Sequence, residues 1–320
     1  MKYIKLMALL LAAGLTACSA DDETERGLLP EESSNLKQRP PFSDDSQAQR
    51  LIIVEVEENP LTDISAPEGE KMETRATATT ASTLAAFSMN YQRGNKYDFS
   101  KEGTMWTTDF SWPVSVENYE KIDFYAYTHG TFYYNEGNPY LNFTVDELAP
   151  NQYDLLVAEH KQISYNEVKD SEGKAHVSLS FNHACAAVQF KIGQSQTLAN
   201  KSVTFKSIAL VGVYNSGNYY YNQNPAWQGL LSVSGDGEAI YTLEDATSIT
   251  FPVSTKTHEG ARALSCGCLF MIPQAHSNAK IRIGYDSDKT ADISLGDINW
   301  EAGKLYTISI RLGTKTIPTE

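Results

Sequence analysis

Cys18 is the residue whose surroundings point most directly to a chemical modification. The chain opens with Lys2 and Lys5 and a short apolar run that ends near residue 14. This is the charged and then apolar pattern of a secretory signal, and it is too short for a membrane-spanning helix. Leu-Thr-Ala-Cys at 15–18 has the order of a bacterial lipobox. We predict cleavage between Ala17 and Cys18 and attachment of diacylglycerol to the Cys18 thiol. The alternative is an ordinary signal in which Cys18 is incidental.

Three further cysteines are the other candidates for covalent or metal chemistry: Cys185, Cys266 and Cys268. Their number is odd, and a bridge between 266 and 268 would close a strained small ring. His183 lies close enough to Cys185 to share a metal, but no Cys-x-x-Cys or spaced Cys/His set accompanies them. We therefore expect buried or half-buried thiols, a histidine at a strand end, and neither a metal nor a cofactor.

Signatures of catalysis are missing from the sequence. It contains no Gly-x-Ser-x-Gly, no His-Glu-x-x-His, no phosphate loop and no Gly-x-Gly-x-x-Gly before a helix. Carboxylates are numerous, but one sequence does not pair two of them in space, so a glycosidase cannot be argued. The sequence predicts no catalytic residue and a protein that is not an enzyme. A hydrolase with an unrecognised site stays open as an alternative.

An aromatic group is the strongest candidate for ligand contact. It consists of Tyr219, Tyr220, Tyr221 and Trp227. Rings of this kind could form a platform on which a sugar stacks. The alternative is an aromatic strand whose rings pack across the face of a β-sandwich.

The charge balance limits the classes of partner. The chain has 26 Lys and Arg against 40 Asp and Glu, a formal net charge of −14. Residues 19–75 hold 15 acidic and 6 basic side chains, so much of the excess lies near the N-terminus. Such a balance argues against binding nucleic acid and against electrostatic attraction to anionic lipid.

The N-terminal part contains one strand between two polar stretches. Residues 18–49 are rich in Ser, Asp, Glu, Pro and Gln, which predicts a flexible acidic tether. Residues 51–57 predict a strand, and residues 58–82 predict a loop of unusual length. Arg75 and Ala76 lie in that loop among small residues that a trypsin-like protease could reach.

The rest of the chain predicts an all-β fold. From residue 87 onward, short β-branched and aromatic runs alternate with Gly, Asn, Asp and Ser turns, without an amphipathic helix of 12 residues. The length exceeds what one sandwich needs, so we predict an N-terminal sandwich over 50–175 and a C-terminal one over 176–320. The polar stretch 166–174 marks the junction, unless it is a hairpin loop inside one domain.

A series of strand motifs resembles the fimbrillin-like family of the Bacteroidales, the subunits of type V pili, over nearly all of residues 50–312. Each piece is short, and the order of the pieces behind a lipobox carries the resemblance. The pieces are Trp106, Phe110-Ser-Trp-Pro113, Ile122-Asp-Phe-Tyr-Ala-Tyr127, Asp154-Leu-Leu-Val-Ala158, Val177-Ser-Leu-Ser-Phe-Asn-His-Ala184, Ala187-Val-Gln-Phe-Lys-Ile192, Leu269-Phe-Met-Ile-Pro-Gln274 and Ile298-Asn-Trp-Glu-Ala-Gly-Lys-Leu-Tyr-Thr-Ile308.

The resemblance implies two transthyretin-like β-sandwiches and a lipidated precursor at the outer membrane and cell surface. An Arg-specific protease would cut a loop after the first strand, and a strand from a neighbouring pilus subunit would fill the groove. Residues 51–57 would then be the removable strand and Arg75–Ala76 the cut. The alternatives are a cut at Arg50, which leaves the strand in place, and a strand that is never cut.

Two further expectations concern the role within a pilus. Only residues 313–320, with Pro318, follow the last predicted strand, which would make a poor donor segment. This favours a tip or accessory subunit over a stalk subunit. The alternative function is a cell-surface lipoprotein that binds a glycan or a host protein and does not polymerise.

Overall fold

The computed structural model describes residues 50–63, 84–91, 96–102, 105–107, 111–113, 115–194, 202–231, 239–250, 262–263, 268–286 and 289–312. Nearly all of its regular structure is β-strand, and the described helices are α1 (Tyr165–Val168) and a 3-10 turn, Ala149–Asn151. The predicted all-β class is confirmed, whereas the signal peptide and the number of domains stay predictions. None of the helices in these ranges is long and apolar enough to cross a membrane.

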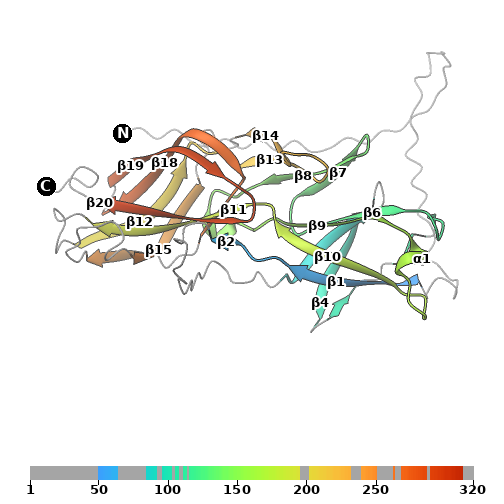
Figure 1. Ribbon diagram of the computed structural model, residues 1–320. Helices are drawn as coiled ribbons and strands as arrows, with labels where there is room; N and C mark the ends of the chain where they lie inside the picture. Colours follow the sequence, from blue (N-terminus) through green and yellow to red (C-terminus); the bar gives the residue numbers. More distant parts are fainter. Residues whose placement is uncertain are drawn as a thin grey trace, which may run out of the picture. The chain divides into compact units, whose positions relative to one another are not determined.

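A seven-stranded sheet forms the first part of the fold. Its order is β1-β10-β9-β6-β3-β4-β5, and β1 runs parallel to β10 while the other neighbours are antiparallel (Figure 1). The strand bounds are Ile52–Glu58 (β1), Ala175–His183 (β10), Leu156–Ile163 (β9), Ile122–Tyr127 (β6), Ala86–Tyr91 (β3), Lys96–Glu102 (β4) and Met105–Thr107 (β5).

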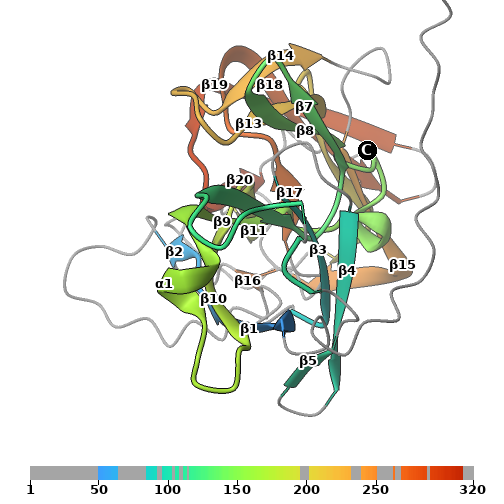
Figure 2. The same ribbon diagram turned by 90° about the vertical axis from the view of Figure 1, so that its right-hand side faces the viewer.

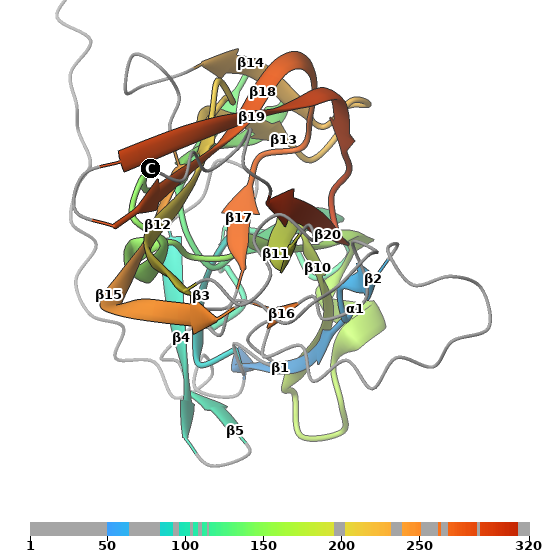
Figure 3. The ribbon, with the colours of Figure 1, turned by 90° about the vertical axis from the view of Figure 1, so that its left-hand side faces the viewer.

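Two further sheets enclose a second core. One has the order β16-β11-β20-β2, with β17 also paired to β11, and the other has the order β15-β12-β18-β19 (Figure 3). Their buried residues, such as Phe190, Phe205 and Ile281, form one cluster. The strand bounds are Arg262–Ala263 (β16), Ala186–Gln194 (β11), Lys304–Leu312 (β20), Thr62–Asp63 (β2), Leu269–Met271 (β17), Ala239–Thr250 (β15), Ser202–Val211 (β12), Gln274–Tyr285 (β18) and Lys289–Trp300 (β19).

The fourth sheet joins two hairpins that are far apart in the sequence. Its order is β14-β13-β8-β7, and the two hairpins meet where β13 pairs with β8 (Figure 2). The strand bounds are Trp227–Leu231 (β14), Ser216–Tyr220 (β13), Asn138–Thr144 (β8) and Thr131–Asn135 (β7). Side chains on one face of this sheet pack with Tyr127 and Val157 of the seven-stranded sheet.

Sheet membership does not follow the division expected between residues 175 and 176. Strand β10 begins at Ala175 and pairs with β1 and β9, so residues 176–183 lie in the first sheet. Strands β13 and β14, from the expected second half, pair with β8 from the first. The physical reason is that Ala175, Val177 and Leu179 place their side chains in the first core, whatever the polarity of the loop before them.

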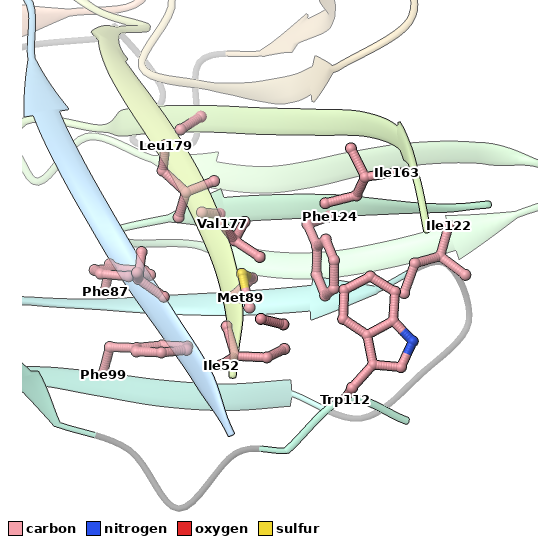
Figure 4. Packing of buried hydrophobic residues seen from close by; sticks show 14 of the residues in the cluster. Ile52, Phe87, Met89, Phe99, Trp112, Ile122, Phe124, Ile163, Val177 and Leu179 are labelled. Atoms are coloured by element: carbon pink, nitrogen blue, oxygen red, sulfur yellow. The ribbon is translucent and has the colours of Figure 1, made fainter. Parts of the chain in front are cut away.

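The core of the seven-stranded sheet is rich in aromatic rings. Phe87 stacks on Phe99 with ring centroids 4.7 Å apart, and Phe181 meets Phe87 edge-on at 5.2 Å. Trp112 is fully buried and packs edge-on against Phe124 at 5.6 Å (Figure 4). The indole Nε1–H of Trp112 has no hydrogen-bond partner among the described residues. The Trp112 side chain therefore stabilises this core through packing alone.

We expect Trp112→Ala to lower the free energy of unfolding by about 3–5 kcal/mol, because it leaves a large cavity. Trp112→Phe should cost clearly less, since it keeps an aromatic ring and removes a buried N–H that has no partner. Urea denaturation followed by circular dichroism would measure both. Tyr119→Ala is the control, because Tyr119 is 74% exposed and should change stability by less than about 0.5 kcal/mol. Equal losses for the two Trp112 variants would contradict this view of the core.

Candidate functional site

Strand β1 is the ladder partner of β10 along most of the length of β10. The register runs from Ile52 opposite Ala175 to Glu58 opposite Phe181. On the other side, β10 pairs with β9 only through Asn182 and His183. Apart from a single bridge between Ala175 and Lys169, no other strand in the described ranges forms a backbone ladder with residues 175–181. Strand β9 instead contacts this stretch through a side chain, between His160 Nδ1 and the Ser178 carbonyl at 3.0 Å. The pairing of β1 therefore holds β10 in the sheet.

The side chains of β1 alternate between the core and solvent, as a strand period of two requires. Ile52 and Val54 are buried and Val56 is half-buried, and all three belong to the cluster of Phe87, Phe99 and Trp112. Figure 4 shows Ile52 beside β1, among Phe87, Phe99 and Trp112 of this cluster. Ile53, Glu55 and Glu57 on the opposite face are exposed. The two buried residues, Ile52 and Val54, each contribute about 1.5–3 kcal/mol by burial, and the half-buried Val56 contributes less.

The N-terminal end of β1 is held on both sides. The Leu51 carbonyl accepts a hydrogen bond from the Ala175 N–H at 2.8 Å, and the Arg50 carbonyl accepts one from the Trp112 N–H at 2.8 Å. The Arg50 guanidinium lies 4.6 Å from the centroid of the Tyr165 ring. Its Nε and Nη2 are buried, and neither has a hydrogen-bond partner among the described residues. The cation–π contact is thus the main interaction of this charge.

The C-terminal end of β1 continues to a second sheet. The Asn59 N–H donates to the Phe181 carbonyl at 2.9 Å, and its amide donates to Asn182 Oδ1 at 2.9 Å. Three residues later, β2 pairs in parallel with the start of β20, at Lys304 and Leu305. One short segment, residues 50–63, therefore lies along the edges of two sheets. Residues 64–83, with Arg75 and Ala76, lie outside the described residues, as does Cys18.

A buried ion pair lies beside the end of β1. His183 Nδ1 and Asp154 Oδ2 form a short contact, and their side chains are 9% and 6% exposed. Burial alone would lower the pKa of His183, but the hydrogen bond and charge of Asp154, together with Glu58 of β1, raise it above its ordinary value. Burial in turn raises the pKa of Glu58. The pair therefore links His183, at the end of β10 beside β1, to Asp154, which precedes β9.

The cysteines and the histidine considered for metal binding are buried or half-buried where the structure describes them. Cys185 is fully buried, and this burial raises the pKa of its thiol. Cys268 is half-buried, while Cys266 lies outside the described residues. No group of three or more His, Cys, Asp or Glu in the described ranges could hold a metal ion. His183 lies at the end of a strand, as expected, and its partner is a carboxylate.

The aromatic candidates for ligand contact fall on two faces of the fourth sheet. Tyr219, Tyr221 and Trp227 pack in the core beneath it. The Trp227 indole N–H donates to the Ala184 carbonyl at 2.8 Å. The ring of Tyr220 instead packs against Tyr140, with centroids 5.0 Å apart and the ring planes tilted. The predicted group is therefore divided, and packing across a sheet accounts for three of its four members.

Comparison with known proteins identifies the family. A model of the fimbrillin-like family matches residues 63–320, which is most of the chain and begins just after β1. This chain belongs to the fimbrillin-like family. The family consists of fimbrial, adhesion-type proteins of the cell surface, and its members are structural rather than enzymatic.

Solved structures align with this fimbrillin-like chain at low identity. A putative cell adhesion protein from Bacteroides ovatus aligns with a TM-score of 0.50 at 14% identity, covering 82% of this chain and 92% of the other. A fimbrial protein from Bacteroides vulgatus aligns with a TM-score of 0.47 at 16% identity, covering 81% and 95%. No curated protein sequence matches the chain. At these identities the likeness concerns the fold alone.

Sequence reasoning missed two features of this fimbrillin-like protein. Asp154 lies 29 residues before His183, and nothing in the local pattern pairs them. Tyr133 and Tyr140 flank a tight turn at Glu136 and Gly137, where both residues have positive φ. That hairpin signal could have placed the two tyrosines opposite each other, because turn geometry sets the register.

We expect Ile52→Ala to lower the free energy of unfolding by about 2–5 kcal/mol, because it opens a cavity under β1. Ile53→Ala is a matched control on the next residue, which faces solvent and is 36% exposed, against 5% for Ile52. Hydrogen exchange of the amides of residues 175–181 would report whether the pairing with β10 loosens. Equal effects of the two changes would contradict the observed orientation of β1.

The His183–Asp154 pair should make stability depend on pH. Because the pKa of His183 is raised, the stabilisation is complete below the ordinary value of 6.5 and is lost as pH rises through the folded-state pKa. We therefore expect the difference in Tm between the wild type and His183→Gln to shrink as pH rises above about 6.5. His160→Gln, on β9 of the same sheet, serves as the control. A difference in Tm that grows with pH would show that the sign is wrong.

Proposed function

We propose that this chain is a fimbrial subunit that is exported as a lipidated precursor and assembled by strand exchange after proteolysis. In this proposal, Cys18 carries the lipid that holds the precursor at the outer membrane. An Arg-specific protease then cuts between Arg75 and Ala76 and so frees the segment that contains β1 and β2. A strand from a neighbouring subunit takes its place. The observation that carries the proposal is that β1 is the ladder partner of residues 175–181 of β10.

Loss of β1 would leave the edge of β10 without a partner strand. The backbone N–H and C=O groups of β10 that face β1 would lose their strand partners and form an open edge on which another strand can pair. The rings of Phe87, Phe99 and Trp112 would lose the cover of Ile52 and Val54. A strand with β-branched residues at alternate positions would restore both the hydrogen bonds and the cover.

The edge that receives an incoming strand would extend beyond the first sheet. Because β2 lies on β20, removal of residues 50–75 also uncovers the start of β20. The Gly303 carbonyl, which accepts a hydrogen bond from the Thr62 N–H at 2.9 Å, would become free as well. An incoming strand could therefore follow the path of the removed segment from β10 to β20.

The position of β20 favours a tip or accessory role over a stalk role. It pairs in parallel with β11 over eight residues, from Leu305 to Leu312, and has β2 on its other side. Leu305 and Ile310 are buried, and Ile310 belongs to the second core. Swinging β20 out to serve a neighbour would break this ladder. The chain is therefore suited to receive a strand while keeping its own last strand in place.

The alternative is a surface lipoprotein that keeps β1, does not polymerise and binds a glycan or a host protein. The hydrogen bonds of Asn59 and the contact of Arg50 with Tyr165 favour it, because they hold both ends of β1 in place. Under this alternative β1 completes the first sheet permanently. The two functions differ in the N-terminus of the mature protein.

We expect the protein recovered from its native cell surface to begin at Ala76 and to carry no lipid. Arg75→Lys should abolish this form and leave a lipidated chain that begins at Cys18, because an Arg-specific protease does not accept lysine. Arg50→Lys is the matched control and should still yield the Ala76 form. Intact-mass spectrometry and N-terminal sequencing measure both outcomes.

Recovery of only the chain that begins at Cys18 from wild-type cells would overturn the strand-exchange proposal and favour the alternative. A mature chain that begins at Leu51 would also overturn it, because that cut leaves β1 in place.

A further inference from the structure

The sheet β14-β13-β8-β7 is free of charge. Its four strands contain no Asp, Glu, Lys, Arg or His, although charged residues make up 21% of the chain. Protein surfaces ordinarily carry about 25–35% charged residues. One face of the sheet is core, where charge is not expected, but the other face is open to solvent and carries none either. Its composition therefore needs an explanation other than burial.

The solvent-exposed face has an ordered arrangement of aromatic rings. Tyr133, Tyr140 and Tyr220 lie directly opposite one another on three neighbouring strands. Their ring centroids are 5.1 and 5.0 Å apart, so the rings form a row across the sheet, with Tyr133 stacked on Tyr140 and Tyr220 tilted against Tyr140. Tyr133 ends the row on the edge strand β7 and is 46% exposed. The row therefore presents ring edges, phenol groups and the outer side of Tyr133 to solvent.

A second row, of amides and a hydroxyl, lies beside the tyrosines. Thr131, Asn142, Asn218 and Gln228 are opposite one another across all four strands. The Asn142 amide donates to Asn218 Oδ1 at 3.0 Å, which orients both side chains. Both residues keep donors and acceptors that this single bond does not use. The face thus combines flat apolar surface with uncharged groups that can both donate and accept hydrogen bonds.

The core beneath holds this face rigid. The Trp227 indole donates to the Ala184 carbonyl, and the Tyr221 hydroxyl donates to the Ala126 carbonyl at 3.0 Å. These bonds tie β14 to Ala184 and the turn after β13 to Ala126. The two rows are therefore in place before a ligand arrives. A surface that is ordered in advance loses less entropy on binding.

The chemistry of the two rows selects a class of ligand. Without cations, the face cannot neutralise phosphate or sulfate, and without carboxylates it cannot hold a calcium ion that bridges to a sugar. A net charge of −14 repels anionic polymers. Sugar hydroxyls match amides and phenols, and the C–H faces of a pyranose match aromatic surface. We propose that this face binds a neutral polysaccharide, with Tyr133, Tyr140 and Tyr220 making the apolar contacts and Asn142 and Asn218 the polar ones.

This proposal is independent of strand exchange, because the face lies on a different sheet from β1 and β10. It also replaces the ligand site expected from the sequence. Of the four aromatic residues in that expectation only Tyr220 remains, and Tyr133 and Tyr140 join it from the other hairpin.

Affinity electrophoresis of the full-length chain, purified in mild detergent, tests the proposal. The native gels contain a β-glucan, a xyloglucan, a galactomannan or a starch, and polygalacturonate serves as the anionic comparison. We expect at least one neutral polysaccharide to retard the wild type and polygalacturonate to have no effect. The double change Tyr133→Ala and Tyr220→Ala should weaken the retardation by about tenfold or more. Tyr119→Ala should leave it unchanged, because Tyr119 is an exposed tyrosine outside this sheet.

Asn142→Ala is a second variant in case the double change disturbs folding. Asn142 is exposed, so its truncation removes a polar contact without opening a core cavity. It should weaken retardation while leaving the circular dichroism spectrum and Tm unchanged. Absence of retardation in all four neutral gels would overturn the proposal. So would retardation by polygalacturonate alone, or an equal loss in Tyr119→Ala. Dimerisation of the wild type that is lost in the double variant, without retardation, would assign the face to a protein partner instead.

Discussion

The parallel pairing of β1 with β10 is the interaction on which the first sheet depends. Strand β10 supplies Val177, Leu179 and Phe181 to the core, but β9 pairs only with its last two residues. The continuous backbone ladder along the rest of β10 comes from β1. A strand from near the N-terminus thus determines whether a strand more than 120 residues later stays in place. In this fimbrillin-like chain, removal of β1 would therefore change the first sheet.

The connection between β10 and β11 carries this dependence into the second core. Only Ala184 and Cys185 separate the two strands, and their backbone groups bond to several parts of the fold. Three of these groups join them to other segments: the Ala184 N–H donates to the Leu155 carbonyl, the Ala184 carbonyl accepts from Trp227, and the Cys185 carbonyl accepts from the Gly303 N–H. With the His183–Asp154 pair alongside, a change at the end of β1 acts on residues that belong to several sheets.

The fourth sheet shows a different principle. Two hairpins, each an excursion between strands of another sheet, complete each other by pairing β8 with β13. Neither hairpin would be stable alone, since an isolated two-stranded hairpin is marginal in water. Joined together, they cover Tyr127 and Val157 on one side and present uncharged rows on the other. Packing of one face of this sheet on the core thus fixes the position of the other face, whose residues take no part in the core.

The sequence by itself determined the β class, the location of most strands and the isolated first strand. These follow from local patterns: alternation in residues 175–181 and β-branched residues in 51–57 require no knowledge of the rest of the chain. Family membership could also be predicted, because the order of the short motifs is recognisable even where overall identity to relatives is low.

Only the tertiary structure decided which strands pair and which face of each strand meets solvent. The sequence placed Tyr219, Tyr220, Tyr221 and Trp227 in one group, and the pleat of β13 sent Tyr220 to the opposite face from its neighbours. It placed the division of the chain at residue 175, and the register with β1 kept β10 in the first sheet. The physical reason is that hydrophobic periodicity is a local property of the chain. Strand pairing is settled by non-local contacts, which a single sequence does not display.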